Sequence, residues 1–483
     1  MLTERSKLIW VYLISLLFIA VNTYLIVNHF IWGALAPVIM TILLLYFISI
    51  DKIILLITFL TPLAINFKSF EFGVGISLPT EPLMFGVLVF FLIKLLHTGR
   101  YDVRILKHPL SIAILFNLIW IFFTSITSEL PIVSFKFLAS RLWFVIPFFF
   151  FIILMFKKIS NIRLFVWLYM ISFIIVIIYT IVHHSIRGLN EVAGHWVMRP
   201  FYNDHTAYGA MLAMFIPVLF SFTIDKKYNF SLRVVSSFVF ALFLVAIVLS
   251  YSRAAWLSLA GALGVLALIL LKIKFRWVLI FLTVIIGTFY AFKQPILDKL
   301  ERNKQDSSAN FIEHVQSIAN ITTDPSNLER INRWQSAFRM SGERPFWGWG
   351  PGTYQFLYAP YQRSKEKTII STNVGDMGNA HSEYIGPFVE SGIFGMLSVF
   401  VIFIISIYTG IKVYKKSDTR ELKLISITVL MGLITYYIHG FLNNFLDTDK
   451  ASVPVWGFMA ILVALDIYHV SDQNRTIGEH LKD

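Results

Sequence analysis

The sequence contains no cysteine, so neither a disulfide framework nor thiolate chemistry is available to it. It also has no Gly/Ser-rich or Pro-rich linker, no low-complexity tract and no repeat of fixed period. Charged residues make up only 14% of the 483 residues. Apolar residues take their place, at 57% of the chain, with a mean hydropathy of +0.72. This usage excludes an ordinary soluble protein and predicts a polytopic membrane protein.

Runs of about 17 to 25 apolar residues predict membrane-spanning helices. We expect an all-α polytopic membrane protein of about 12–14 transmembrane helices with one large helical periplasmic loop. The basic start, MLTERSK, is followed by no small-residue cleavage site, so the first run is predicted to be a retained anchor. The predicted spans are 8–27, 30–49, 52–66, 81–97, 109–125, 136–156, 163–183, 206–223, 231–250, 254–272, 275–292, 385–411, 421–440 and 453–470. The simplest division is a first membrane part at 1–292, a loop domain at 293–384 and a last membrane part at 385–483.

The distribution of Lys and Arg predicts the orientation, because short basic loops stay in the cytoplasm. Every second connection is basic: 99–108, 157–163, 225–233, 272–276 and 412–423. The other connections are predicted to lie outside the cytoplasm: 67–80, 126–135, 184–205, 250–253, 293–384 and 441–452. The net charge of +13 is therefore explained by topology and does not indicate a nucleic-acid partner.

The long loop is expected to have structure of its own, since about ninety residues without any would be unusual. Apolar periodicity predicts helices at 311–321 and 328–340. The following segment, ERPFWGWGPGTYQFLY at 343–358, sets glycines between aromatic rings, which predicts tight backbone bends. Its spacing, and the lack of a preceding strand, exclude a P-loop or a dinucleotide-binding turn.

Four arginines on the predicted outer side are candidate substrate ligands. Arg253 stands at a corner between two spans, where a guanidinium needs a partner or a role, either as an interfacial arginine or as an anion site. Arg330 and Arg333 share a helix face that either is solvated or binds an anion. Arg199 lies in HWVMRPFYNDHTAYG, where ordinary loop polarity is the preferred explanation.

His381 begins the apolar span that contains Glu390. The two residues are nine apart, so on one helix they would face opposite sides, and Glu390 is not expected to orient His381. Glu383 is two residues away and also does not face His381 within a helix. His381 is interpreted either as a capping or interfacial histidine or as a general base, since an ordinary imidazole is mostly neutral at pH 7. Glu390 is interpreted as a structural or tuning group.

Neither a metal site nor a cofactor site is predicted. The acidic pair Asp447 and Asp449 is similar to a short metal-binding signature, but it is better explained as the end of a loop. His183 and His184 are adjacent, which is poor spacing for two metal ligands on one helix.

Four segments in order resemble the signature of the O-antigen ligase and polymerase family. They are SRAAW at 252–256, RINRW at 330–334, PFWGWGPGTY at 345–354 and HSEYIGPFVESG at 381–392. The resemblance implies a metal-independent glycosyltransferase in the bacterial inner membrane, with its active site on the periplasmic side. It implies an undecaprenyl pyrophosphate-linked glycan donor and a lipid A-core or glycan acceptor.

Residue by residue, the resemblance implies that Arg253 and Arg330 grip the donor pyrophosphate and that His381 activates the acceptor hydroxyl. Arg199 and Arg333 are further candidate ligands. A departing pyrophosphate needs positive charge more than a general acid, whereas the attacking hydroxyl must lose a proton. Ligase and polymerase activities remain alternatives. A lipid-linked glycan transporter is a third alternative, although paired intramembrane charges and internal pseudo-symmetry would be expected of it.

Overall fold

The computed structural model describes residues 4–28, 36–69, 74–274, 325–363 and 378–470, with scattered positions between 276 and 288. The helix predicted at 311–321 and most of the span predicted at 275–292 lie outside these residues. Contacts divide the chain into two units, Met1–Ile53 and Ile54–Asp483. The three-part division drawn from the sequence stays a prediction.

The first unit contains α1 (Glu4–Val27), α2 (Ala36–Ile48) and the start of α3 (Ile50–Leu60). Its helices cover the first two predicted spans. Among the described residues neither reaches the length of a membrane span: α2 has 13 residues, and the described apolar stretch of α1 is Tyr12–Val27.

The second unit contains ten helices, among the described residues, that are long and apolar enough to cross a membrane. Each matches one predicted span, which confirms the helical, polytopic fold. They are α4 (Thr80–Thr98), α6 (Pro109–Ile126), the continuous α7 (Pro131–Val145), η3 (Ile146–Phe151) and α8 (Ile152–Met155), α9 (Ile159–Ser185), α11 (His205–Ile224), α12 (Phe230–Leu249), α13 (Arg253–Leu270), α19 (Ile385–Lys416), α20 (Arg420–His439), and α21 (Asp449–Ala464) with η6 (Leu465–Val470). Between them lie the 19-residue helix α17 (Pro325–Glu343) and four short elements: α5 (Val103–Leu106), α10 (Glu191–Gly194), α18 (Tyr354–Leu357) and η4 (Ala359–Tyr361).

The third predicted span, 52–66, is wrong. The helix α3 ends at Leu60, and a short 3-10 turn, η2 (Thr61–Leu63), follows. Pro62 lies in that turn, and proline has no N–H to continue an α-helix. The chain then forms an antiparallel hairpin of β1 (Ile65–Ser69) and β2 (Val74–Leu78), with Ile65 opposite Leu78. A small sheet therefore stands where the sequence predicts a helix and a loop.

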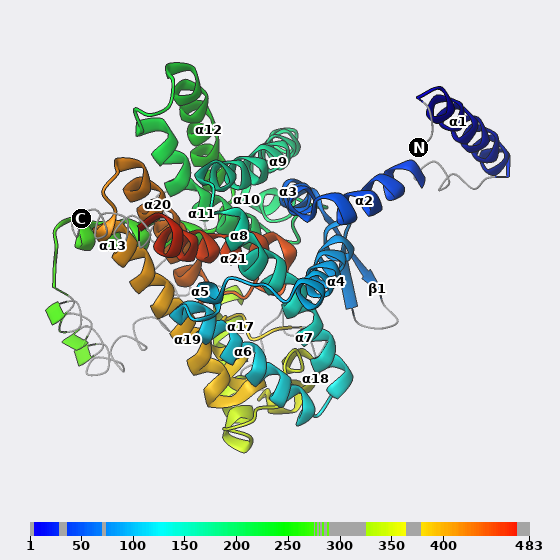
Figure 1. Cartoon of the computed structure of the whole chain (residues 1–483). Coiled ribbons are helices and arrows are strands. Elements are labelled where there is room, and N and C mark those ends of the chain that lie inside the picture. Colours follow the sequence, from blue (N-terminus) through cyan, green and yellow to red (C-terminus); the bar gives the residue numbers. More distant parts are fainter. Residues whose placement is uncertain are drawn as a thin grey trace. The chain divides into compact units, whose positions relative to one another are not determined.

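The core of the second unit lies around α21. Within the membrane-spanning stretch of this helix 94% of the residues are buried, compared with 17% within that of α13. The helix α21 contacts α7, α8, α19 and α20 (Figure 1). Glycines also let other helices of this unit pack closely. A Cβ on Gly432 of α20 would lie 2.5 Å from the carbonyl oxygen of Met214 on α11. Small residues let the backbones of membrane helices approach each other in this way.

The two predicted sets of connections make contacts within each set. At the loop-rich end, which holds the connections predicted to be outside the cytoplasm, the Thr80 hydroxyl donates to Asp449 at 2.6 Å. At the basic end, Arg163 and Lys227 form ion pairs with Glu421. Successive connections thus alternate between the loop-rich end and the basic end, as the distribution of Lys and Arg predicts.

Candidate active site at the loop-rich end

The predicted helix at 328–340 is found within α17. Its Arg333 is buried, with Nε 2.8 Å from Glu329 Oε1 and Nη1 3.2 Å from the carbonyl oxygen of Asn379. A Cβ on Gly378 would lie 1.4 Å from Arg333 Nη1, so a larger residue here would displace the guanidinium from its present position. Trp334 Nε1 donates to the carbonyl oxygen of Ala380 at 3.1 Å. Together these contacts fasten the strap, residues 378–380, to α17.

His381 follows the strap directly. Its backbone φ of 46° is in the left-handed region, and its N–H donates to Asn379 Oδ1 at 3.1 Å. Burial, together with the nearby guanidinium groups of Arg333 and Arg330, lowers the pKa of the imidazole to about 3. His381 is therefore neutral at pH 7 in the unliganded protein, and two cations lie within electrostatic range of it.

Arg330 reaches toward the connection after α20, where its Nε donates to the carbonyl oxygen of Leu442 at 3.2 Å. It lies one turn from Arg333 on α17, as predicted. Arg253 is the first residue of α13, after a corner in which Tyr251 has a φ of 50°. Both Arg253 and Arg330 lie within electrostatic range of the His205 imidazole.

The corner before Arg253 is held tightly. A Cβ on Gly209 of α11 would lie 2.7 Å from the Cβ of Ser252, so α11 and the corner nearly touch. The Tyr251 hydroxyl donates to the carbonyl oxygen of Leu189 at 2.9 Å. These contacts fix the backbone position from which the side chain of Arg253 extends.

Arg199 is exposed, and its Nε donates to the carbonyl oxygen of Asn203 at 3.0 Å within the same loop. Its own carbonyl oxygen accepts from the Tyr179 hydroxyl at 2.9 Å. Arg199 is thus hydrogen-bonded within the 199–203 loop, whereas Arg330 and Arg333 lie within electrostatic range of His381.

Glu390 lies on α19 and bonds the backbone at the start of α18. Its Oε1 accepts from the N–H of Tyr354 at 3.2 Å, and its carbonyl oxygen accepts from the N–H of Gly350 at 2.8 Å. The predicted tight bends are confirmed, since Gly348, Gly350 and Gly352 all have positive φ, at 68°, 115° and 75°.

Glu383 has a structural position that the sequence did not reveal. Its Oε1 accepts from the Tyr436 hydroxyl at 2.5 Å and from the N–H groups of Phe445 and Leu446 at 2.7 and 2.9 Å. Burial raises the pKa of this carboxyl to about 7. Glu383 therefore joins the His381 segment to the connection after α20. Nothing local in HSEYIG distinguishes it, since all three donors lie more than 50 residues away.

Two further groups of polar residues lie near this site. His439 is 1% exposed, and among the described residues its Nε2 has no hydrogen-bond partner. The rings of His195 and His205 are stacked with centroids 4.2 Å apart. Asp204 caps α11 by accepting from the N–H groups of Thr206 and Ala207 at 2.8 and 2.9 Å. The buried His439 cannot be inferred from apolar periodicity, because it ends a helix whose residues are mostly apolar.

The acidic pair Asp447 and Asp449 ends a loop, as expected. Asp447 forms an ion pair with Arg141 at 2.9 Å. Asp449 begins α21 and accepts from the Thr80 hydroxyl at 2.6 Å. Both carboxylates thus hold elements together.

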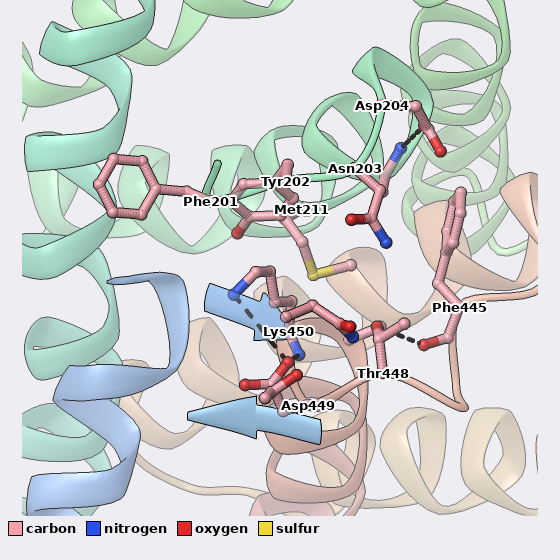
Figure 2. A pocket seen from close by; sticks show the side chains of 13 residues that line it. Phe201, Tyr202, Asn203, Asp204, Met211, Phe445, Thr448, Asp449 and Lys450 are labelled. Carbon is pink, nitrogen blue, oxygen red and sulfur yellow. Dashed lines mark hydrogen bonds and ion pairs between the residues drawn. The ribbon is translucent and has the colours of Figure 1, made fainter. Parts of the chain in front are cut away.

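A pocket opens beside these residues, between the hairpin, the start of α11 and the start of α21 (Figure 2). Asp204 lines it together with Phe445, the residue whose N–H is bonded to Glu383. The pocket therefore adjoins the connection that the His381 segment is fastened to.

The fold and this site define a class: a multi-pass membrane protein with a histidine and arginines gathered among the connections at one end of its spans. A model of the family described as O-Antigen ligase matches residues 238–400. The matched stretch contains Arg253, Arg330, Arg333, His381 and Glu390. The resemblance to the O-antigen ligase family is thereby confirmed over this part of the chain.

One relative of the chain is a protein named "Uncharacterized protein" from Haemophilus influenzae (strain ATCC 51907 / DSM 11121 / KW20 / Rd). The two are 22% identical over 250 residues. The alignment covers 51% of this chain and 60% of the relative, so this chain spans less than two thirds of that protein.

Proposed function

We propose that this protein is an O-antigen ligase-like glycosyltransferase of the bacterial inner membrane. It would move a glycan from undecaprenyl pyrophosphate to a lipid A-core acceptor on the periplasmic face, without a metal ion. The observation that supports the proposal is that Arg330 and Arg333 lie within electrostatic range of His381. All three residues belong to the stretch that matches the O-antigen ligase family.

In this mechanism the arginines bind the donor. Guanidinium groups match phosphate oxygens with paired hydrogen bonds and keep their charge at any working pH. Arg330 and Arg253 come from α17 and from the corner before α13, so they would approach the pyrophosphate from two elements. When the bond between the anomeric carbon and the pyrophosphate oxygen breaks, its electron pair stays on that oxygen, and the two cations stabilise the negative charge.

His381 would act on the acceptor. The acceptor hydroxyl oxygen forms the new bond to the anomeric carbon and loses its proton to the imidazole. The low pKa of His381 keeps the imidazole ready to accept that proton. When the pyrophosphate binds, its negative charges offset those of Arg330 and Arg333, which raises the pKa of His381 and makes it a stronger base.

Arg333 has a different part in this proposal from Arg330. Its guanidinium is engaged by Glu329 and by the carbonyl oxygen of Asn379, next to the strap. Arg333 would therefore position His381, and its charge would act on the site through space.

Reconstitution in lipid vesicles tests the proposal. The purified chain receives an undecaprenyl pyrophosphate oligosaccharide together with either a lipid A-core or a second lipid-linked repeat, and a His381→Ala sample serves as the control. Glycan on the lipid A-core identifies a ligase, whereas a lengthened lipid-linked glycan identifies a polymerase. Donor that crosses the bilayer without any product would overturn the enzyme proposal in favour of transport.

A further inference from the structure

The segment PFWGWGPG at 345–352 forms a turn between α17 and α18, here called the glycine turn. It places two aromatic rings on the surface, since Phe346 is 62% exposed and Trp347 is 48% exposed. Residues 345–362 contain no charged side chain, although they belong to a connection between spans. Exposed rings in a segment without charges mark a contact with a partner or with lipid.

The rings of the glycine turn continue a column of rings that begins on α6. The ring of Trp347 is stacked on Trp120 of α6 with centroids 5.2 Å apart, and Phe116 of the same helix is stacked on Trp120 at 6.4 Å. Trp120 lies six residues before the end of α6, which is about 9 Å along the helix axis. The ring of Trp347 therefore lies beside the interior of a spanning helix and not at its tip.

The backbone of the turn also bonds to α19, which is interrupted at Gly392. The carbonyl oxygens of Val389 and Glu390 accept from N–H groups of the turn at 3.0 and 2.8 Å. The N–H of Ile393 donates to the carbonyl oxygen of Pro345 at 2.9 Å. These atoms lie about 6 to 12 Å along the axis from the start of α19. Irregular backbone at membrane depth is stable only where protein groups supply its hydrogen bonds, and here the turn supplies them.

The neighbouring sides of α6 and α19 indicate what covers these rings. In a spanning helix, an exposed apolar side faces the acyl chains of the lipids. Trp120 joins the turn to the exposed sides of both helices, because its ring also contacts Phe394 of α19 at 5.2 Å between centroids. The exposed apolar residues of these sides include Ile112, Phe116, Ile119 and Phe123 on α6, and Phe394, Leu397, Val401 and Ile404 on α19.

An ion pair marks the water side of this surface. Arg344, the residue before the turn, pairs with Glu129 at 2.7 Å, and both side chains are exposed. The N–H of Glu129 donates to the carbonyl oxygen of Trp349 at 3.0 Å, so the ion pair and the turn are held together. Trp349 Nε1 donates in turn to the carbonyl oxygen of Met340 on α17 at 2.9 Å. The glycine turn is thus bonded both to the spans and to α17.

We propose that the glycine turn is a re-entrant segment, which dips into the membrane leaflet at the loop-rich end and presents Phe346 and Trp347 to its lipids. The partner is the bilayer itself, at the boundary between headgroups and acyl chains, where tryptophan is favoured. The inference is independent of the proposed function, since it involves no substrate and no reaction. It makes the turn an anchor that holds α17, the helix of Arg330 and Arg333, at a fixed height relative to the bilayer.

Spin labelling tests the proposal, because the chain has no native cysteine. Nitroxide labels are attached to single cysteines of the full chain in phosphatidylethanolamine and phosphatidylglycerol nanodiscs. Their collisions are measured with oxygen, which concentrates in acyl chains, and with nickel ethylenediaminediacetate, which stays in water. For Phe346→Cys we expect an oxygen-to-nickel collision ratio at least about fivefold higher than for Glu343→Cys, an exposed position three residues earlier. Leu397→Cys, on the exposed side of α19, is the reference for lipid contact.

A second position protects the test from the failure of one variant, since Trp347→Cys should give the same high ratio as Phe346→Cys. Thermal melting shows which labelled variants are folded. A ratio for the turn equal to that of Glu343→Cys would place the turn in water and overturn the proposal. Protection of the labels from both reagents would also overturn it, because protein would then cover the rings. Dipolar broadening between the labels would identify that protein as a second copy of the chain.

Discussion

Among single side chains, His381 has the most direct test. If it takes the acceptor proton, His381→Asn should lower turnover by about 10²- to 10⁴-fold. Asparagine tolerates the left-handed conformation found at this position, so the folded state should survive. Thermal melting in detergent and binding of labelled donor check that it does. A folded His381→Asn variant with most of its transfer activity would remove the base assignment.

The pH dependence of the wild type follows from the environment of His381. Burial and the nearby arginines lower the pKa of the free imidazole to about 3, so it stays neutral and competent well below pH 6.5. We expect kcat/KM, which reports on the free protein, to hold down to about pH 5, where an ordinary imidazole would already be protonated. The acidic limb of kcat should lie at higher pH, because bound pyrophosphate raises the pKa. A kcat/KM limb at pH 6.5 would contradict the buried setting.

The arginines differ in what a lysine can replace. Arg253→Lys and Arg330→Lys keep the charge and lose the fork of donors, so each should lower kcat/KM for the donor at least tenfold. Arg344→Lys is the matched control, since Arg344 is paired with Glu129 at the surface and should tolerate the change. Initial rates at subsaturating donor provide the measurement. Unchanged rates in both site variants would show that paired hydrogen bonds from these residues are not needed.

Among the structural elements, the glycine turn and α19 depend on each other. Gly392 interrupts α19 with a φ of 68° and a ψ of −170°, a conformation that is almost restricted to glycine. A Cβ there would lie 2.0 Å from the carbonyl oxygen of Phe346 in the turn. Gly392→Ala should therefore lower the free energy of unfolding by at least about 1–3 kcal/mol.

The control for that change lies on α13. A Cβ on Gly264 has nothing within 4 Å and the residue is helical, so Gly264→Ala should leave stability unchanged or slightly higher. Melting curves of both variants in the same detergent provide the comparison. Equal stability of Gly392→Ala and the wild type would mean that the turn can move away from α19 without cost.

For the molecule as a whole, the absence of cysteine makes topology easy to measure. Single cysteines at the exposed positions Val192 and Arg363 should react with a membrane-impermeant maleimide in intact cells that lack an outer-membrane barrier. Cysteines at Lys226 and Lys423, both exposed at the basic end, should react only after the membrane is opened. Labelling of Lys226→Cys in intact cells would reverse the orientation and move the proposed site to the cytoplasm.

The sequence by itself determined the ten spans and their alternation. Whether a segment can cross a membrane depends on its own length and apolar content, and orientation depends on basic residues counted along the chain. The motifs around Arg253, Arg330 and His381 could be recognised for the same reason, since each is a short local pattern.

Only the tertiary structure decided how these pieces meet. Pro62 ends a helix that its apolar neighbours favour, and the hairpin that follows becomes a wall of a pocket. The bond from Thr80 to Asp449 joins residues 369 positions apart, and Glu383 finds its three donors between 53 and 63 positions away. Such contacts join groups that have no fixed spacing along the chain, so local sequence patterns do not predict them. The apolar runs therefore specify which segments enter the membrane, and the packing of those segments specifies which polar residues share a site.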